Sequence, residues 1–521
     1  MEQLLTYIKG LFAARLNVEE LAPQLLALLE YNPQSPMTIV GGLFLVMFLI
    51  FGVGYIAVRR VAWLRTLYVT AFSLYFYYKL SGAYLLLLVA VALSDYTIGW
   101  LVARSRRRGG NGSLWVALSV VINLTILTYF KAGGLLVEWL QKMYDGGVLE
   151  LQAVVIPAGV SFFVFQSIAY VVDISRGRIS PLKNFVDYLF LLSFFPKMFL
   201  GPLVKASEFI PQILAPRLSI SREELGRAVT LIVGGLLKYA IIAKSLGLLF
   251  VAPALAGDMG EGGGVAIMAV LGFTLQIYCD FSGYSDLAVG VALLLGFRLP
   301  DNFDAPYKSA TITEFWRRWH ISLSTWLRDY LYISLGGNRR GALRTYINLI
   351  LTMLLGGLWH GVGLTFLAWG ALHGVALALH KLWMRFVPWA KATGEQMHIL
   401  LRLPSTLLTF VVVAFGWLLF TAKDMAMVER VVHSIVYNTS LSDFTTLLED
   451  SLPALVIMAL GYVMHLLPRR VDMAVQGAVV RIGFVGQWLL VVAMIWCVMQ
   501  CDALLATVAA QGASLPMYAA F

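Results

Sequence analysis

Two histidines, His320 and His360, lie in apolar sequence where an ionisable side chain is unusual. The segment Thr345–Trp359, which precedes His360, is apolar and carries no charge. As a helix that rises 1.5 Å per residue it reaches about 22 Å, less than the roughly 30 Å of a hydrocarbon layer. If the chain spans a membrane, His360 is therefore expected inside it, facing a cavity or the protein interior. Imidazole titrates near neutral pH and accepts protons from hydroxyl groups, so two histidines near one cavity indicate proton transfer.

His320 belongs to the segment 311–338, TITEFWRRWHISLSTWLRDYLYISLGGN. Thr311 or Thr313, with Glu314 in the first turn, predicts a helix start. On one continuous helix, residues three and four apart share a face, which groups His320 with apolar neighbours: Trp316, Leu323, Leu327 and Leu331. A structural histidine bonded to a carbonyl group is the alternative. The segment is also basic and aromatic, as in a helix lying on a membrane surface, but a surface helix does not explain His360.

A further group of polar residues lies in the apolar segment 265–296. Its members are Gln276, Tyr278, Asp280, Ser282, Tyr284, Ser285 and Asp286. Two carboxylates in one hydrophobic helix need internal partners. They indicate either an ion or substrate pathway or polar packing between helices, and the spacing does not decide between the two. Zinc-ligand spacing, phosphate-binding loops, nucleophile elbows and dinucleotide fingerprints do not occur in usable contexts, so no metal site is expected.

The elements that position these residues are predicted to be transmembrane helices. Of the 521 residues, 60% are hydrophobic and only 13% are charged, which is about half the charged fraction of a soluble protein. Apolar segments recur from residue 38 to residue 508, and their lengths predict an all-α polytopic membrane protein with about 11–12 membrane-spanning helices. The formal net charge of +10 then reflects basic cytoplasmic loops and not nucleic-acid binding.

The charge pattern also predicts an orientation. Basic clusters such as 104–108 and 176–183 follow every second crossing, which places them in the cytoplasm and both termini outside. The apolar segment 185–202 contains Pro196 and Lys197, and such broken backbone at membrane depth is tolerated only where protein buries it or it lines a cavity. We expect a re-entrant hairpin there. Residues 1–36 are typical of an amphipathic interfacial segment that precedes a transmembrane domain over 37–521.

Several motifs together resemble one known family. FWRRWHISLSTWLRDYLYISLGGNR (315–339) and LLGGLWHG (354–361) are similar to the signature of the bacterial membrane-bound O-acyltransferases (MBOAT), in the branch of alginate O-acetyltransferases and D-alanyl transfer proteins. Three more segments resemble that branch in the same order: IPAGVSFFVFQSIAYVVD (156–173), FFPKMFLGPLV (194–204) and YCDFSGYSDLAVG (278–290). The resemblance covers about 150–390 and includes a basic cytoplasmic loop, 297–344. It implies a ring of tilted helices with re-entrant segments around a central tunnel.

The resemblance also implies roles for individual residues. His360 corresponds to the family's histidine thought to be catalytic, and His320 to its second functional histidine. Substrate contacts are expected from other residues of the motifs and of the polar helix: Asp280, Tyr284, Asp286, Arg317, Arg318, Trp319, Asn338, Arg339 and Trp359. The cations among them, with Lys308 and Arg340, could engage phosphates of a donor, although they could equally be ordinary positive-inside residues.

The expected reaction is acyl transfer through the membrane. An acyl group, with acetyl as the first expectation, leaves a thioester donor on the cytoplasmic side, either acetyl-CoA or an acyl-phosphopantetheine carrier protein; no bound cofactor is expected. It reaches a hydroxyl group on the outer side, with His360 as general base and His320 orienting the hydroxyl, sharing the proton or stabilising the oxyanion. The product would be an O-acetylated extracellular or cell-wall polysaccharide, completed by a periplasmic or extracellular partner acyltransferase. The location would be the bacterial cytoplasmic (inner) membrane.

Three alternatives stay open at this point. Within the family, the acyl group could be D-alanyl, passed from a carrier protein to a cell-surface polymer. In another class, a proton-coupled transporter or lipid flippase could use the two histidines with Asp280 and Asp286, although the chain shows no internal repeat and only one broken segment. A structural subunit of an export complex would retain assembly and lose no chemistry when His360 is changed.

Overall fold

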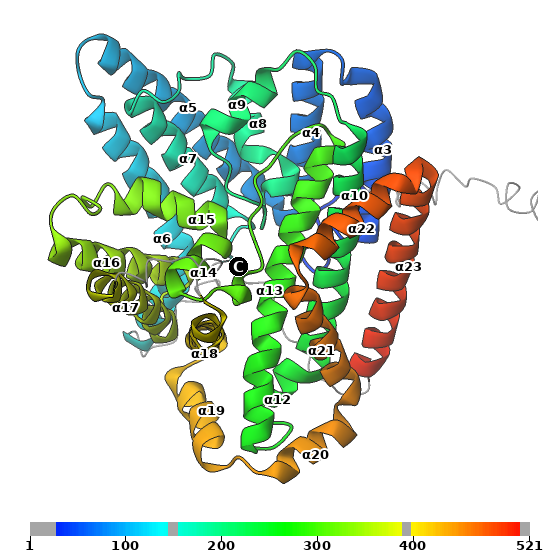
Figure 1. Cartoon of the computed structure of the whole chain (residues 1–521). Helices are drawn as coiled ribbons and strands as arrows, with labels where there is room; N and C mark the ends of the chain where they lie inside the picture. Colours follow the sequence, from blue (N-terminus) through cyan, green and yellow to red (C-terminus); the bar gives the residue numbers. More distant parts are fainter. Residues whose placement is uncertain (1–27, 144–154, 388–397, 511–521) are drawn as a thin grey trace, which may run out of the picture.

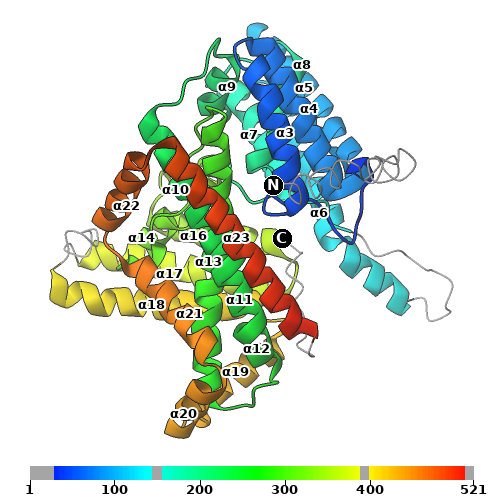
Figure 2. The ribbon, with the colours of Figure 1, turned by 90° about the vertical axis from the view of Figure 1, so that its right-hand side faces the viewer.

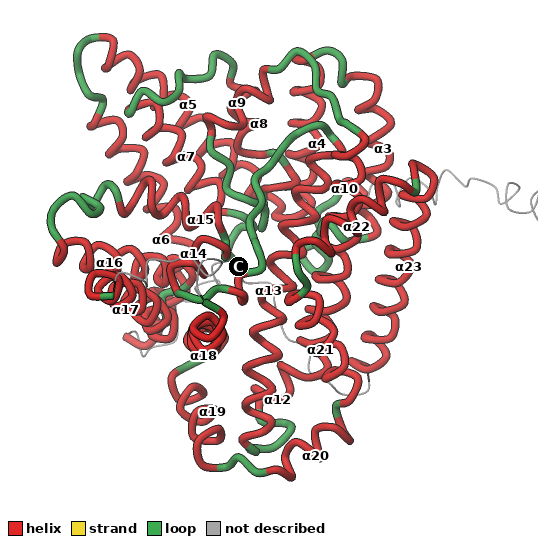
Figure 3. Tube along the Cα trace, in the orientation of Figure 1, coloured by secondary structure: helices red, strands yellow, loops and turns green. Residues whose placement is uncertain are grey.

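A computed structural model describes residues 28–143, 155–387 and 398–510, and in these ranges the chain is helical without strands (Figures 1 and 3). The expected all-α polytopic architecture is thereby confirmed. Seven helices of the described part are long and apolar enough to cross a membrane, or eight if the bent pair α20–α21 counts as one span. Residues 1–27, most of the expected interfacial segment 1–36, lie outside the described residues.

The N-terminal half forms one group of helices, coloured blue to blue-green and lying mostly in the upper part of Figure 1. Its members are α3 (Gly42–Val58), α4 (Ala62–Ser81), α5 (Leu85–Arg107), α6 (Ser113–Met143), α7 (Val160–Ser175), α8 (Phe185–Ser193) and α9 (Ala206–Leu214). The buried guanidinium of Arg65 on α4 donates to the carbonyl oxygens of Ile213 and Ala215. These carbonyl groups lie at the end of α9, so Arg65 caps that helix.

The long helix α13 (Gly263–Leu294) runs through the middle of the molecule. It packs against α10 (Arg222–Leu236) and the segment after it, which contains two π-helical stretches, Leu237–Ala243 and Gly247–Val251, and ends in α12 (Ala252–Ala256). A Cβ atom added at Gly283 would lie 2.7 Å from the backbone nitrogen of Tyr239. This close approach of two backbones is typical of membrane helices that pack through small residues.

The C-terminal half contributes several helices that pack against α13. Two antiparallel neighbours, α16 (Ala342–His360) and α17 (Leu364–Phe386), pack closely, and α18 (Ile399–Thr421) follows them. The chain continues through α19 (Met425–Tyr437), α20 (Leu441–Asp450), α21 (Leu452–Leu466), α22 (Arg469–Arg481) and α23 (Gly483–Ala510). Figure 2 shows α23 lying obliquely in front of α10 and α13, and it packs against α10 and the π-helical stretch Leu237–Ala243.

The segment expected to form a re-entrant hairpin is broken where its proline and lysine occur. Helix α8 ends at Ser193, a short 3-10 turn covers Phe195–Lys197, and the whole break is buried. The ammonium group of Lys197 donates to Gln166 Oε1 on α7 and, at 2.7 Å, to the carbonyl oxygen of Leu191. The buried cation is thus held by neutral acceptors of the neighbouring helices. The depth of this segment in a membrane stays a prediction.

One prediction about local structure is wrong. The segment after Thr311 is not one continuous helix: α14 (Ile312–Arg318) ends before His320, and α15 (Ile321–Trp326) begins after it. A π-helical turn, η6 (Leu327–Tyr332), completes the segment. The predicted start is confirmed, because the Thr311 hydroxyl accepts a hydrogen bond from the backbone nitrogen of Glu314. The continuous helical face expected for His320 and its apolar neighbours is therefore interrupted at His320, although Trp316 and Leu323 still line one cavity with it.

Candidate active site

His360 is the last residue of α16, where Gly361 continues in an extended conformation. Its ring contacts three aromatic rings, with centroid distances of 4.4 Å to Trp359, 5.4 Å to Trp369 and 4.9 Å to Phe420. These neighbours come from α16, α17 and α18. The imidazole is therefore held in an aromatic surrounding at a helix end.

His320 lies in the break between α14 and α15 with a left-handed backbone, φ 42° and ψ 56°. This conformation is uncommon for a residue with a side chain and persists where the surroundings impose it. The backbone nitrogen of Ile321 donates to the carbonyl oxygen of Asn302 at 2.9 Å, and that of Asp304 donates to the carbonyl oxygen of Arg318 at 3.0 Å. The loop that follows α13 therefore fixes the break.

Both histidines line one cavity. Asp280 and Phe281 of α13 line it as well, and the Phe281 ring lies 4.6 Å from the ring of His320. The remaining wall is mostly aromatic and aliphatic: Ile156, Pro157, Val160, Phe162, Leu200, Ile277, Trp316, Trp319, Leu323, Trp359, Trp369, Trp417 and Phe420. The structure thus brings two potential proton acceptors together in a largely apolar chamber.

The cavity also contains polar groups that could contact a substrate. Lys131 of α6 lines it and donates from Nζ to the carbonyl oxygen of His360 at 3.3 Å. In the described part of the chain, the indole N–H groups of Trp316, Trp359 and Trp369 have no hydrogen-bond acceptor. These indole donors and the Lys131 cation therefore belong to a chamber that offers them few hydrogen-bond acceptors.

A second cavity lies on the other side of α15. Ile321 and Ser322 line it, whereas their neighbours His320 and Leu323 line the first cavity. The first turn of α15 is therefore part of the wall between the two cavities. The second cavity is lined by four charged residues, Lys205, Glu208, Asp301 and Arg328, whereas the first is lined by Lys131 and Asp280.

Three aromatic rings form a stack between the cavities. Trp326, which lines the second cavity, stacks on Phe165 at 4.1 Å with an angle of 8° between the planes. Phe165 in turn stacks on Trp359 of the first cavity at 5.2 Å. The indole nitrogen of Trp326 also donates to the carbonyl oxygen of Phe165 at 2.9 Å. We call these three residues the aromatic partition.

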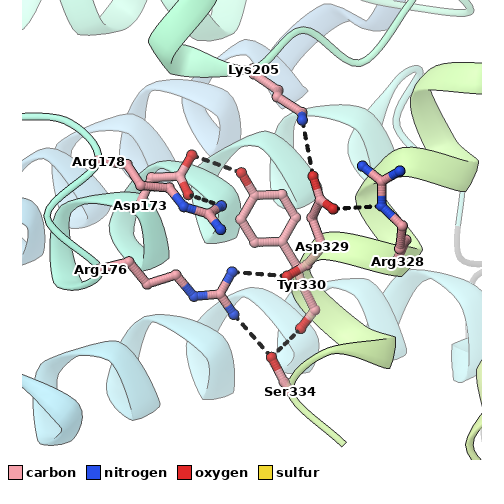
Figure 4. Close-up of polar contacts among 8 residues, drawn as sticks. All are labelled: Asp173, Arg176, Arg178, Lys205, Arg328, Asp329, Tyr330 and Ser334. Carbon is pink, nitrogen blue, oxygen red and sulfur yellow. Dashed lines mark hydrogen bonds and ion pairs between the residues drawn. The ribbon is translucent and has the colours of Figure 1, made fainter. Parts of the chain in front are cut away.

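A polar cluster ties η6 to the end of α7 beside the second cavity (Figure 4). Asp329 accepts from Lys205 at 2.9 Å and from Arg328 at 2.8 Å, and Tyr330 donates to Asp173 at 2.7 Å. Arg176 donates to the backbone oxygen of Asp329 at 2.8 Å. Burial acts to raise the pKa of Asp329, but the bonds from Arg328 and Lys205 outweigh it and the pKa lies below its ordinary value.

The expected substrate-contacting residues separate into two sets. Asp280, Trp319 and Trp359 line the cavity that holds both histidines. The others line neither cavity: Tyr284, Asp286, Arg317, Arg318, Asn338 and Arg339. Asp286 pairs with Lys238 of the first π-helical stretch, and Arg318 contacts Glu314 at 2.9 Å. Asn338 and Arg339 are exposed in the turn before α16.

Sequence reasoning missed several residues of the candidate site. It did not include Lys131 at the end of an apolar segment, although a cation at that position is itself a signal of an internal contact. It did not include Asn302 either, because the partners His320 and Ser322 lie 18 and 20 positions further along the chain. Trp369 offered no signal beyond an aromatic residue in an apolar helix.

Comparisons with known proteins agree with this architecture. Residues 175–402 match the model of the membrane-bound O-acyltransferase family (MBOAT). The chain is 37% identical over 399 residues to the probable alginate O-acetylase AlgI of Pseudomonas putida, covering 74% of this chain and 77% of that protein. It is 33% identical over 397 residues to the peptidoglycan O-acetyltransferase of Helicobacter pylori, covering 70% and 72%. A teichoic acid D-alanyltransferase of Streptococcus thermophilus is 30% identical over 244 residues, covering 44% and 57%.

Proposed function

The chain belongs to the membrane-bound O-acyltransferase family, and on that premise we propose that it transfers an acetyl group from a thioester donor on one side of a membrane to a hydroxyl group on the other. The observation that carries the proposal is the shared cavity of His320 and His360. Two imidazole groups in one apolar chamber suit proton transfer between a hydroxyl group and a thioester.

His360 acts as the general base. It takes the proton of the acceptor hydroxyl group as the oxygen attacks the thioester carbonyl carbon, and the carbon–sulfur bond then breaks. The thiolate leaves with the proton that the His360 imidazolium returns, so an ester and a free thiol are the products. The unpaired indole N–H groups of Trp359 and Trp369, whose rings contact His360, are suited to stabilise the oxyanion.

The donor enters through the second cavity. Lys205 and Arg328 line it, and Arg176 lies in the same polar cluster. Basic residues of membrane proteins concentrate on the cytoplasmic side, where thioester donors are made. These cations are better placed for a donor phosphate than the exposed Arg317 and Arg339, which line neither cavity. The thioester end of acetyl-CoA, or of an acyl-phosphopantetheine carrier, would pass the aromatic partition to reach His360.

The acceptor enters the first cavity from the outer side. The relatives that cover most of this chain are named for O-acetylation of alginate and peptidoglycan, which supports an extracellular or cell-wall polysaccharide as the final product. A partner acyltransferase outside the membrane would complete the transfer. D-alanyl transfer is the second candidate, supported by a relative that covers a smaller share of the chain. The location is the bacterial inner membrane, with the basic loops in the cytoplasm and both termini outside.

Purified protein in detergent tests the reaction and the donor. Loss of thioester and formation of acetyl ester are measured with acetyl-CoA, with an acetylated carrier protein and with a D-alanylated carrier protein. We expect turnover of an acetyl donor that His360→Ala abolishes. His433→Ala is the matched control, because His433 is exposed on α19 and lines neither cavity. If only the D-alanyl donor is turned over, the transferred group is D-alanyl and not acetyl. Equal rates of turnover in wild type and His360→Ala would overturn the mechanism with His360 as general base.

A further inference from the structure

We infer that Asn302 is a positioning residue that fixes the tautomer of His320, with the proton on Nδ1 and the lone pair of Nε2 available to the cavity. The catalytic meaning of this arrangement rests on the proposed function. The tautomer itself follows from three contacts of one atom, Asn302 Oδ1, and can be measured independently of any activity.

The orientation of the Asn302 amide is determined by a backbone group. The backbone nitrogen of Ser322 lies 3.1 Å from Oδ1, and a backbone N–H can only donate. The atom that faces it must therefore be the oxygen of the amide and not its nitrogen. His320 Nδ1 lies 3.2 Å from the same oxygen. Because a carbonyl oxygen only accepts, Nδ1 has to carry the proton.

Ser322 adds a second constraint on the same oxygen. Its hydroxyl group accepts from the backbone nitrogen of Leu203 at 3.0 Å and donates to Asn302 Oδ1 at 2.8 Å. The hydrogen bonds therefore run from Leu203 through Ser322 to Asn302, and from His320 to Asn302. Leu203 follows the buried break after α8, so the chain of bonds joins that segment to the histidine.

The other imidazole nitrogen of His320, Nε2, differs from Nδ1 in having no hydrogen-bond partner among the described residues. His320 is only 2% exposed, it lines the first cavity, and its Nε2 has no hydrogen-bond partner in the described part of the chain. Without a proton, Nε2 is an acceptor. It can orient the acceptor hydroxyl group or receive its proton, but it cannot donate to an oxyanion before it has gained a proton. The charged and titratable groups that share this cavity are Lys131, Asp280 and His360.

Two substitutions of Asn302 distinguish a role in positioning His320 from a role in the stability of the fold. Asn302→Leu keeps the approximate volume and removes the acceptor, whereas Asn302→Asp keeps an acceptor oxygen. We expect kcat to fall about 10- to 100-fold in Asn302→Leu with little change in KM, by analogy with the loss of hydrogen-bond partners that orient metal-ligating histidines. Asn302→Asp should recover most of kcat with the pH profile shifted upward, because a carboxylate stabilises the imidazolium. Gln487→Met is the control for the loss of a buried, hydrogen-bonded amide, because Gln487 lines neither cavity.

Nitrogen-15 NMR of histidine-labelled protein reads the tautomer directly, with the His320 signals identified by their loss in His320→Gln. We expect a protonated Nδ1 and an unprotonated Nε2 in the wild type, and a mixture of tautomers in Asn302→Leu. A protonated Nε2 in the wild type would overturn the inference, even if the protein turned over no donor. Full kcat in Asn302→Leu would overturn the positioning role while leaving acyl transfer intact. Wild-type protein that is inert toward every donor would contradict the proposed function alone.

Discussion

The Lys131 ammonium group of α6 donates to the backbone carbonyl oxygen of His360 at the end of α16. The two residues are 229 positions apart in the chain. A cation at a helix C-terminus satisfies one of the carbonyl groups that lack a partner within the helix and complements the helix dipole. Lys131 therefore helps to hold the residue that we propose as general base.

Replacing Lys131 should change the rate more than substrate binding. In Lys131→Met the end of α16 loses its charged donor, and a displacement of His360 by a fraction of an ångström lowers kcat by about 10- to 100-fold. Lys131→Arg should recover part of the rate, because it restores a donor. Steady-state kinetics on both variants check this, and an unchanged kcat in Lys131→Met would show that α16 keeps its position without the contact.

Adjacent glycines of α16 allow a matched test of helix packing. A Cβ atom at Gly357 would lie 2.3 Å from the carbonyl oxygen of Phe366, whereas the nearest atom to a Cβ at Gly356 is 3.7 Å away. Gly357→Ala should therefore push α16 from α17 and cost about 1–3 kcal/mol of stability. Gly356→Ala should be tolerated. Thermal unfolding in detergent compares the two, and equal unfolding temperatures would contradict the close packing.

The aromatic partition should keep water from the thioester. In Trp326→Ala the stack on Phe165 is lost, and we expect donor hydrolysis without acceptor to rise relative to transfer. Trp326→Phe retains a ring and should change this ratio little. The control is Trp496→Ala, because Trp496 is 61% exposed on α23. Unchanged hydrolysis in Trp326→Ala would show that another part of the wall excludes water.

The polar cluster at η6 predicts a dependence of stability on pH. Because the pKa of Asp329 is lowered in the folded protein, its ionised form contributes stability above the unfolded pKa of about 3.9, and this contribution is lost as the pH falls through the folded value. Asp329→Asn should lower the unfolding temperature at neutral pH and flatten its decline in acid. Unfolding curves from pH 7 to pH 3 measure this, and parallel declines in both proteins would exclude Asp329 as a contributor.

Sequence patterns predicted those features that depend on neighbouring residues. The all-α membrane architecture follows from apolar segment lengths, the start of α14 from Thr311 and Glu314, and the break after α8 from Pro196 and Lys197. The left-handed backbone of His320 could not be predicted, because it depends on bonds to the loop around Asn302.

The candidate site could likewise be predicted only where it depends on neighbouring residues and not where it depends on contacts between distant parts of the chain. The motifs singled out His320 and His360, and the structure places both at one cavity. Lys131 was missed because its contact with α16 joins distant parts of the chain. Asp286 was grouped with Asp280 by sequence, yet it pairs with Lys238 and does not line the cavity. Helical spacing cannot show which of two nearby carboxylates has a cation beside it.

Acetyl transfer across a sealed membrane distinguishes the proposed reaction from every alternative. The protein is reconstituted in vesicles with the labelled acetyl donor only on the side of the basic loops and a hydroxyl acceptor only on the other side. We expect labelled acetyl ester on the acceptor side with wild type and with His433→Ala, and none with His360→Ala. Label that appears at the same rate with His360→Ala, in vesicles shown to be sealed, would contradict transfer through the histidine cavity.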